Sequence, residues 1–242
     1  MERRTGLIIR GRSPQVLEDS PQLRRTVCES FIRNLVELHS LDHESAGLKD
    51  LGHPEGYCRR QVEGWTKRYG VAKTHEWPGL EAAIAWLNAN IPTESGAALV
   101  HNDYKFDNIV LDPNHLTKIN AVLDWEMVTI GDPLMDLGTT LGYWMSPDAG
   151  NDLLNMPFNP RVLMENVGRN QLVEMYAAAS GRKVDNILFY YVFGTFKIAV
   201  IAQQIYSRFV KGFTKDERFA HFDKFVFALG MISSRAIESG HI

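Results

Sequence analysis

The sequence predicts an α+β fold that is mostly helical, with one small β-hairpin region near its middle. Segments with apolar residues at helical spacing flank the middle on both sides, and short apolar runs separated by polar turns occupy residues 98–123. With 242 residues, 45% hydrophobic and 23% charged, the chain has the composition of an ordinary globular protein. We expect residues 13–242 to form one helical unit that carries a functional loop at residues 99–136.

Charge and cysteine usage exclude several classes of protein. The net charge is −3 and no long run of one sign occurs, so neither nucleic acid nor a membrane surface is an expected partner. Cys28 and Cys58 lack metal-binding or redox spacing and indicate buried free thiols in a reducing compartment, so we expect a cytoplasmic protein. The basic start lacks the apolar core of a signal peptide. The apolar run at 187–205 is interrupted by Gly194, Lys197 and a Gln pair, which favours a core helix over a membrane span.

The first third of the chain predicts an extended piece at 5–10, a loop at 11–19 and three helices. Ser20 and Pro21 are a cap and a first-turn proline for a helix that ends near His39. We interpret His39 as a helix-end residue favoured by the helix dipole rather than as a ligand. Further helices are expected at 56–69 and 78–91. The tryptophans there suit core packing, and a substrate-pocket wall is the alternative: Trp65, Trp77 and Trp86.

Three short strands are expected at 98–100, 109–111 and 119–123, with a turn at 112–114. The last two should form an antiparallel hairpin, whose short connection places the start of one strand beside the end of the next. Asp103 and Asn108 precede the first of these strands, and Asp124 follows the second. The sequence therefore predicts that these three polar side chains converge.

The convergent residue types suit phosphoryl transfer. His101, Asp103 and Asn108 form H-x-D-x-x-x-x-N, with the spacing of the catalytic Asp and metal-binding Asn of protein kinases. Such a reaction needs one acidic group near the acceptor hydroxyl and oxygen ligands for magnesium. Each motif alone is a weak signal, and Asp132 before Pro133 is equally well an ordinary helix cap. The combination of these motifs at the observed spacing is specific for a phosphotransferase-like site.

The last third predicts a helix at 133–144 and three more at 160–179, 184–209 and 215–238. The segment at 146–160 between them is rich in Pro, Gly, Asn and Met. It is longer than a simple connection, so we interpret it as a lid or acceptor-pocket loop, with plain disorder as the alternative.

Residues 99–108 (LVHNDYKFDN), 122–126 (VLDWE) and 131–137 (GDPLMDL) resemble the aminoglycoside phosphotransferase family of kinase-like enzymes. The subgroup is similar to the kinase-like domain of some acyl-CoA dehydrogenase family members. Asn102 replaces the usual Gly, as it does in choline and ethanolamine kinases. The likeness extends weakly over the chain to about residue 235.

This resemblance implies an ATP- and magnesium-dependent phosphotransferase acting on a hydroxyl of a small molecule, with a protein-kinase-like carboxy-terminal lobe. It implies that Asp103 is the catalytic base, that Asn108 and Asp124 hold magnesium and nucleotide, and that His101 and Asp136 brace the loop. Lys105 in the same loop is counted with the catalytic residues. The start of the chain, residues 1–12, resembles the hinge, so Met1 and Glu2 are assigned to the nucleotide site.

The chain contains no G-x-G-x-x-G loop and no strand lysine before the catalytic loop. We therefore expect it to represent the carboxy-terminal lobe alone and to be a poor kinase by itself. A homo-oligomer or a partner covering the exposed face is expected. The alternatives are a catalytically silent kinase-like binding module and, less well supported, metal-dependent hydrolysis. The carboxy-terminal helices lack an acidic cluster and carry Lys197, Arg208 and Lys211, which argues against a polycationic acceptor and leaves a hydroxyacyl-type metabolite.

Overall fold

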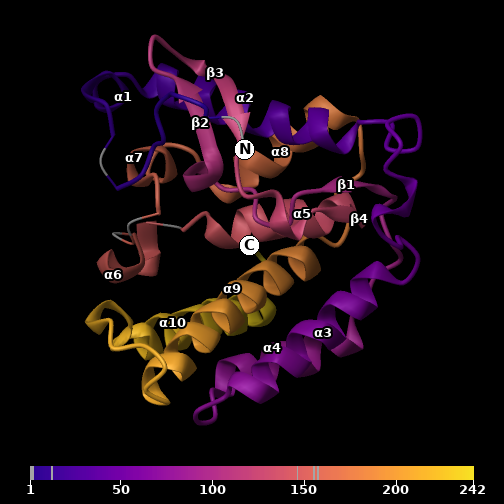
Figure 1. Cartoon of the computed structure of the whole chain (residues 1–242), viewed down its shortest axis with the longest axis vertical. Coiled ribbons are helices and arrows are strands. Elements are labelled where there is room, and N and C mark those ends of the chain that lie inside the picture. The colour runs from indigo at the N-terminus through magenta and orange to yellow at the C-terminus, as the bar shows by residue number, and fades with distance from the viewer. Residues whose placement is uncertain (1–2, 12, 146, 155, 157) are drawn as a thin grey trace.

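The computed structural model is an α+β fold in which helices surround two small antiparallel sheets (Figure 1). It describes residues 3–11, 13–145, 147–154, 156 and 158–242. The strands lie together with α1, α2 and α8 in one half of the molecule, and α3, α4, α9 and α10 make up the other half. The expected fold class, mostly helical with a small hairpin region, is confirmed.

The helices follow the amphipathic segments of the sequence, with short 3-10 turns between some of them. They are α1 (Gln15–Asp19), α2 (Pro21–His39), α3 (Tyr57–Ala72), α4 (Pro78–Ala89), α5 (Pro133–Tyr143), α6 (Asn151–Leu154), α7 (Arg161–Met164), α8 (Arg169–Ser180), α9 (Ile187–Val210) and α10 (Phe222–Ser239). The 3-10 turns are η1 (Lys49–Leu51), η2 (Phe106–Asn108), η3 (Trp125–Met127), η4 (Pro147–Ala149) and η5 (Glu217–Phe219).

Within the described residues, the four strands form two separate pairs. Strand β1 (Ala98–Val100) pairs with β4 (Thr129–Gly131), and β2 (Ile109–Asp112) pairs with β3 (His115–Val122), both antiparallel. The second pair is the expected hairpin. The chain near its start adds one bridge to it, because the Leu7 and Leu111 backbones exchange hydrogen bonds of 2.9 and 2.8 Å.

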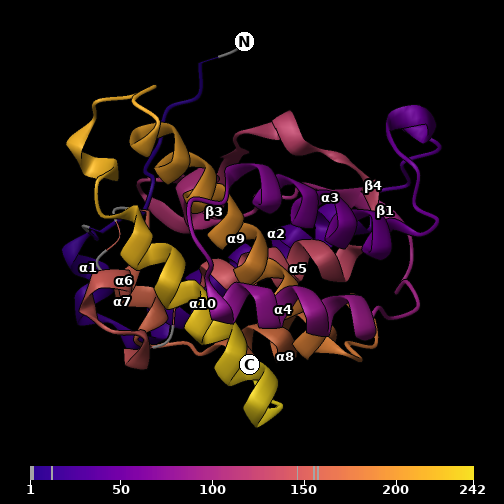
Figure 2. The same ribbon diagram turned by 90° about the horizontal axis from the view of Figure 1, so that it is seen from below.

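Helices α5 and α9 cross in the middle of the molecule (Figures 1 and 2) at glycines that allow backbone contact. A Cβ atom added at Gly194 would lie 2.0 Å from the Gly138 carbonyl oxygen, and one added at Gly138 would lie 2.2 Å from that of Tyr190. No side chain fits at these positions without moving a helix. This close crossing brings Asp136 of α5 and Lys197 of α9 to the same loop.

Three expectations for irregular segments are wrong. Residues 15–19 of the expected loop form α1, whose Leu17 is buried. The expected helix at 160–179 is divided into α7 and α8, because Gly168 starts a new helix with its N–H bonded to the Gln171 side chain. The expected loop at 146–160 contains η4 and α6 in its described part. In each case the secondary structure of a short segment depends on a few tertiary contacts, because the segment has no hydrophobic periodicity of its own.

The expectations for cysteine and most aromatic residues are confirmed. Cys28 and Cys58 are free and buried, and burial raises the pKa of the Cys28 thiol to about 12. Trp65 and Trp77 are buried in the core, and Trp86 packs against the Phe189 ring. Helix α9 is long and apolar enough to cross a membrane by composition, but 78% of its apolar window is buried inside the protein. It is the central core helix.

Candidate active site

The predicted catalytic residues lie together at one end of the β2–β3 hairpin. The Leu123 N–H donates to the Asn108 carbonyl at 2.8 Å, which closes this end of the ladder and places Asp124 beside the start of β2. The Asn108 amide nitrogen donates to both the backbone carbonyl and the carboxylate of Asp103, each at 2.9 Å. The structure therefore brings Asp103 and Asn108 into contact and places Asp124 on the neighbouring strand end.

Asp124 and Asn108 each leave a side-chain oxygen available. Asp124 is exposed, and its backbone has φ +64°, a left-handed conformation that Asp tolerates better than most residues. Within the described residues neither the Asp124 carboxylate nor the Asn108 amide oxygen accepts a hydrogen bond. No cluster of three or more His, Cys, Asp or Glu suited to a metal occurs in the described part of the chain. Two oxygens suit magnesium, which takes its remaining ligands from phosphate and water.

Asp136, at the start of α5, binds the backbone of the loop through its carboxylate. Its two carboxylate oxygens accept the N–H groups of His101 and Asn102, each at 2.7 Å, and the His39 ring nitrogen Nε2 lies 3.2 Å from one of them. Burial alone would raise the pKa of Asp136, but the bond to His39 and the backbone donor of His101 hold it below its usual value. The carboxylate therefore stays ionised in the core.

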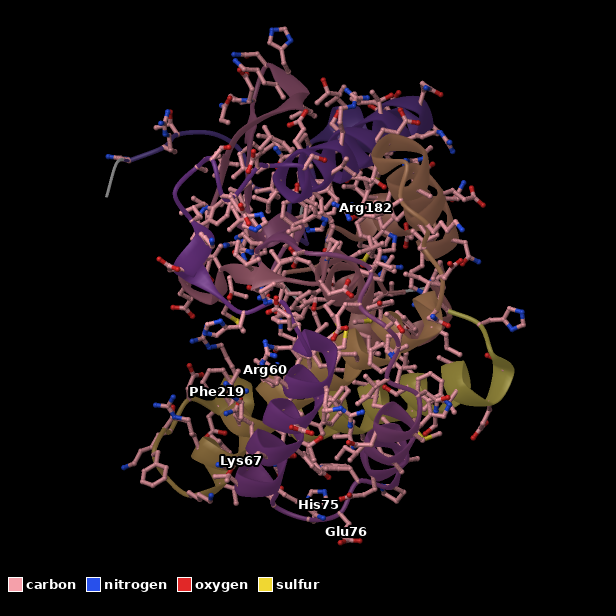
Figure 3. All side chains as sticks on the ribbon, turned by 90° about the vertical axis from the view of Figure 1, so that its right-hand side faces the viewer. Arg60, Lys67, His75, Glu76, Arg182 and Phe219 are labelled. Atoms are coloured by element: carbon pink, nitrogen blue, oxygen red, sulfur yellow. The ribbon has the colours of Figure 1, made fainter. Side chains whose placement is uncertain are left out.

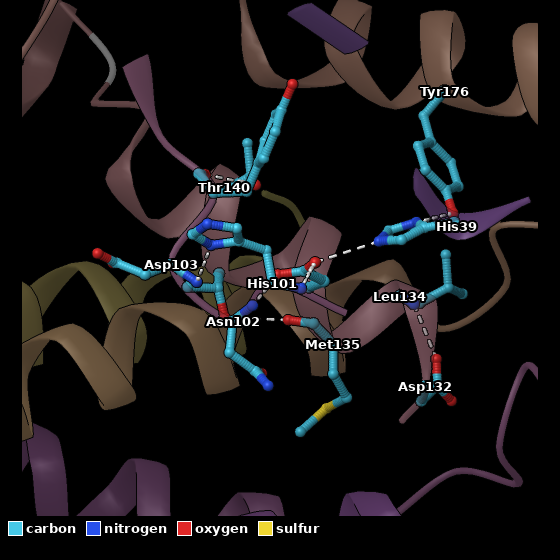
Figure 4. A network of polar contacts seen from close by, with 12 residues as sticks. His39, His101, Asn102, Asp103, Asp132, Leu134, Met135, Thr140 and Tyr176 are labelled. Atoms are coloured by element: carbon cyan, nitrogen blue, oxygen red, sulfur yellow. Dashed lines mark hydrogen bonds and ion pairs between the residues drawn. The ribbon is translucent and has the colours of Figure 1, made fainter. Parts of the chain in front are cut away.

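His39 is the last residue of α2, as expected, and it is buried between two hydrogen-bond partners. Because the Asp136 carboxylate can only accept, His39 Nε2–H donates to it, and the Tyr176 hydroxyl donates to Nδ1 at 2.8 Å. Figure 4 shows the His39 ring next to the Tyr176 hydroxyl. Its partners are 97 and 137 residues away, so no local pattern could reveal this role.

His101 links the two sides of the site. Its Nδ1 accepts the Asp103 N–H at 3.2 Å, and its Nε2 lies 2.8 Å from the Leu123 carbonyl. A ring with Nδ1 as acceptor and Nε2–H as donor is the neutral tautomer that satisfies both contacts. His101 thus fixes the backbone of Asp103 and of the residue before Asp124 relative to one another.

Lys105 supplies a positive charge beside the candidate base. Its Nζ lies 2.8 Å from the Asp103 carboxylate and 4.6 Å from the centre of the Tyr143 ring. Burial raises the pKa of Tyr143 well above its usual value, and the negative charge of Asp103 raises it further. Tyr143 therefore stays neutral, and the Asp103 carboxylate is held by Asn108 on one side and Lys105 on the other.

A model described as the phosphotransferase enzyme family matches residues 1–162, more than half of the chain. The chain belongs to the phosphotransferase enzyme family. A Ralstonia eutropha protein named "putative aminoglycoside phosphotransferase" superposes with a TM-score of 0.83 and 27% identity, over 99% of this chain and 72% of that one. A choline kinase from Cryptosporidium parvum superposes with a TM-score of 0.60 over 90% of this chain and 68% of that one, and at 11% identity it shows the fold alone. The kinase-like fold and the resemblance found in the motifs are confirmed.

Similar sequences occur inside larger proteins. Acyl-CoA dehydrogenase family member 11 of Gallus gallus is 35% identical over 199 residues, which is 81% of this chain and 26% of that protein. The Homo sapiens protein of the same name is 34% identical over 218 residues, 86% of this chain and 26% of that protein. The chain thus spans about a quarter of the length of the curated relatives it matches. Their dehydrogenase name describes the whole proteins.

Asn102, where the motif resemblance leads us to expect Gly, has φ +66°. Asn is the residue that best replaces Gly in this left-handed conformation. Its side chain also closes the site, because it accepts from the Tyr57 hydroxyl at 3.1 Å and donates to the Met127 carbonyl at 3.0 Å. The substitution therefore joins the phosphotransferase catalytic loop to α3 and to the segment after Asp124.

Lys197 is a residue of the site that sequence reasoning missed. It is 1% exposed in the middle of α9, and its Nζ donates to the Asn102 carbonyl at 2.5 Å. Burial lowers its pKa to about 8, and the carboxylates of Asp136 and Asp103 oppose that fall. The sequence signal is one lysine in an apolar helix, which indicates an interruption of the apolar run and a basic residue near the acceptor but does not reveal the bond to the catalytic loop.

Two other predicted positions have plainer outcomes. The Asp132 carboxylate accepts the Leu134 N–H at 2.8 Å and the Ser95 hydroxyl at 2.5 Å. Asp132 is therefore an ordinary helix cap of α5, which was the alternative to a role in the site. Met1 and Glu2, assigned to the nucleotide site of the phosphotransferase by resemblance, lie outside the described residues.

Proposed function

We propose that this phosphotransferase moves the γ-phosphoryl group of magnesium-bound ATP to a hydroxyl group of a small molecule. The observation that carries the proposal is the Asp103 carboxylate, held by Asn108 at 2.9 Å and Lys105 at 2.8 Å next to the end of the strand that delivers Asp124. An acidic group beside the acceptor and oxygen ligands for magnesium are two of the parts that phosphoryl-transfer sites share.

Asp103 acts as the base that orients the acceptor hydroxyl and takes its proton as the oxygen attacks phosphorus. Lys105 keeps the carboxylate in place and carries a positive charge toward the transferred group. The chain's own residues contribute mainly by position, because phosphoryl transfer requires little covalent chemistry from the protein.

Asn108 and Asp124 would hold magnesium. The fit follows from their donors: both are hard oxygens, and the Asn108 amide is turned by its two bonds to Asp103 so that its oxygen remains available. The ion, when bound, neutralises the phosphate oxygens and the charge that develops on them. His101 sets the separation between the two sides of this site through its bonds to Asp103 and to the Leu123 carbonyl.

We also propose that the protein acts in the cytoplasm on a small-molecule acceptor and that it binds neither nucleic acid nor a membrane. We further propose that a second copy of the chain or a partner chain covers the face on which the nucleotide would bind. A glycine-rich loop supplied by that partner would complete the contacts to the ATP phosphates. The alternative of a catalytically silent binding module differs in one measurable respect: it binds a ligand without turnover.

The test is phosphate transfer from Mg·ATP to a panel of small alcohols, hydroxyacids and amino alcohols, followed by mass spectrometry of the products. Asp103→Asn should abolish transfer to whichever acceptor works. Asp112→Asn, at the far end of the same hairpin, is the matched control that removes a carboxylate without touching the site. Equal turnover in both variants would refute the role of Asp103, and ligand binding without product, also in the presence of a partner that supplies the glycine-rich loop, would favour the silent binding module.

A further inference from the structure

The peptide bond between Asn102 and Asp103, directly before the proposed base, is held at both of its polar atoms. The Lys197 ammonium of α9 donates to the Asn102 carbonyl at 2.5 Å, and the Asp103 N–H donates to His101 Nδ1 at 3.2 Å. Because a peptide unit is planar, two bonds at its carbonyl and its N–H fix the orientation of the whole plane. The Asp103 carboxylate is attached next to this plane, so the two bonds also set its direction.

Asn102 itself is bound by two side chains of opposite charge. Its N–H donates to the Asp136 carboxylate of α5 at 2.7 Å, and its carbonyl accepts from Lys197 of α9. Asp136 lies two residues before Gly138, and Lys197 lies three residues after Gly194, where the backbones of α5 and α9 make their close contact. One helix therefore presents an anion to this loop residue and the other presents a cation.

Lys197 reaches the loop from inside the protein. Its side chain is 1% exposed, and its Nζ lies 5.5 Å from the centre of the Trp65 ring. Trp65 lines an open pocket of about 580 Å³ beside the loop, and Arg60 and Arg68 of α3 line it as well, but Lys197 does not. Lys197 therefore acts through Asn102 and not by touching a molecule in the pocket.

The charge of Lys197 depends on its surroundings. Burial lowers its pKa to about 8, so the ammonium is present at pH 7 and largely lost above about pH 9. Two carboxylates favour the charged form and two cations oppose it: Asp136 of α5, Asp103 and Lys105 of the loop, and Arg68 of α3. Helices α4 and α10 meet α9 through uncharged side chains, among them Trp86 at Phe189 and Ser233 at Thr195.

The bond from Lys197 to the loop weakens when the lysine loses its proton. A hydrogen bond from a charged donor is roughly twice as strong as one from a neutral donor, so a neutral amine holds the Asn102 carbonyl less firmly. The peptide before Asp103 then keeps its bond to His101 at one atom and is loosened at the other. Phosphoryl transfer depends on the position of the base, because positioning supplies most of the catalysis.

We infer that Lys197 is a positioning residue, whose positive charge fixes the peptide bond before Asp103 and thereby directs the Asp103 carboxylate toward the acceptor hydroxyl. Transfer then requires a protonated Lys197 and falls when the lysine loses its proton. The inference rests on the proposed function for the role of Asp103 as the base, whereas the effect of the Lys197 charge on the loop can be measured without any transfer.

The first measurement follows the full chain by carbon-detected NMR from about pH 6 to 10, without nucleotide or acceptor. The carbonyl carbon of Asn102 should titrate with the same midpoint as the Cε carbon of Lys197, near pH 8. A common midpoint in two residues 95 positions apart reports the bond that joins them. In Lys197→Met this titration of Asn102 should be absent. Separate midpoints, or an Asn102 signal that does not titrate near pH 8, overturn the inference.

The second measurement is the steady-state rate of transfer, over the same pH range, to the acceptor found in the panel. Lys197→Met fills the same space without the charge, and it should lower kcat about 10- to 100-fold at pH 7 and leave the KM for Mg·ATP unchanged. The fall of kcat near pH 8 in the parent should be absent from the variant. A purely structural lysine would change the melting temperature and the folded fraction, but it would leave the pH profile of the remaining enzyme as it was.

Two further variants complete the experiment. Lys197→Gln keeps an N–H donor without the charge, so it should retain more activity than Lys197→Met and also lack the fall near pH 8. Lys67→Met removes an exposed lysine that lies further along α3 than Arg60 (Figure 3), and it should keep the profile of the parent. A fall near pH 8 that persists in Lys197→Met, or an effect confined to KM, overturns the inference. If the two carbon signals titrate together but no hydroxylated acceptor is phosphorylated, the proposed function fails and the control of the loop by Lys197 stands.

Discussion

Replacing Lys197 with Met tests whether the buried lysine behaves as the structure requires. The side chain is fully enclosed by α9, α3 and the catalytic loop, and burial lowers its pKa from 10.5 to about 8. A difference of about 2.5 pH units corresponds to about 3 kcal/mol of unfavourable burial of the charged form. Below pH 8 the lysine is charged in both the folded and unfolded states, so this destabilisation is fully present.

Between pH 8 and 10.5 the folded lysine has lost its proton while the unfolded lysine keeps it. The unfolded state then binds more protons, so the contribution of Lys197 to stability becomes less unfavourable as the pH rises. In Lys197→Met this pH dependence disappears, and the variant also loses the bond to the Asn102 carbonyl, a constant penalty of about 1–3 kcal/mol. The stability difference between variant and parent should therefore move in favour of the parent by up to about 3 kcal/mol across this pH range.

The assay is urea unfolding, followed by tryptophan fluorescence, at pH 7, 8, 9 and 10 for both proteins. Buried cysteine and tyrosine groups with raised pKa values, such as Cys28 and Tyr57, lower the stability of both proteins at high pH and cancel in the difference. Lys67→Met, at an exposed position of α3, should show a difference that does not depend on pH. A Lys197→Met difference that stays constant to within about 0.5 kcal/mol would refute the reasoning.

Three further changes test the site and its support. Asp103→Asn should lower kcat by about 10²- to 10⁴-fold and leave ATP affinity unchanged, and steady-state kinetics within a few-fold of the parent would assign the base elsewhere. Asp124→Ala should remove magnesium-dependent nucleotide binding in calorimetric titration with only a small loss of melting temperature, because the side chain is exposed but Ala tolerates the φ of +64° less well than Asp; unchanged binding would exclude Asp124 as a ligand. Gly194→Ala should destabilise the protein by about 1–3 kcal/mol or more through overpacking against Gly138. Gly70→Ala, where an added Cβ meets nothing within 4 Å, should be neutral or stabilising, and similar melting temperatures for both would contradict the close crossing.

Much of the local structure could be predicted because its causes are local. The Ser20 hydroxyl accepts the Leu23 N–H at 3.2 Å, and Asp132 caps α5 in the same way. The hairpin follows from two apolar runs and a turn, and the separation of Asp103 and Asn108 follows from the loop length. These features depend on residues a few positions apart, whose spacing the sequence contains.

The sequence by itself determined the family motif, most of the longer helices and the candidate base with the residues proposed to hold magnesium. Only the tertiary structure decided that His39 bonds Asp136 across 97 residues and that Lys197 bonds Asn102 across 95. It also decided that Arg60 and Arg68 face an open pocket beside the loop. The physical reason is that burial and long-range partners set the role of a charged side chain, and the local spacing of residues in the sequence contains neither.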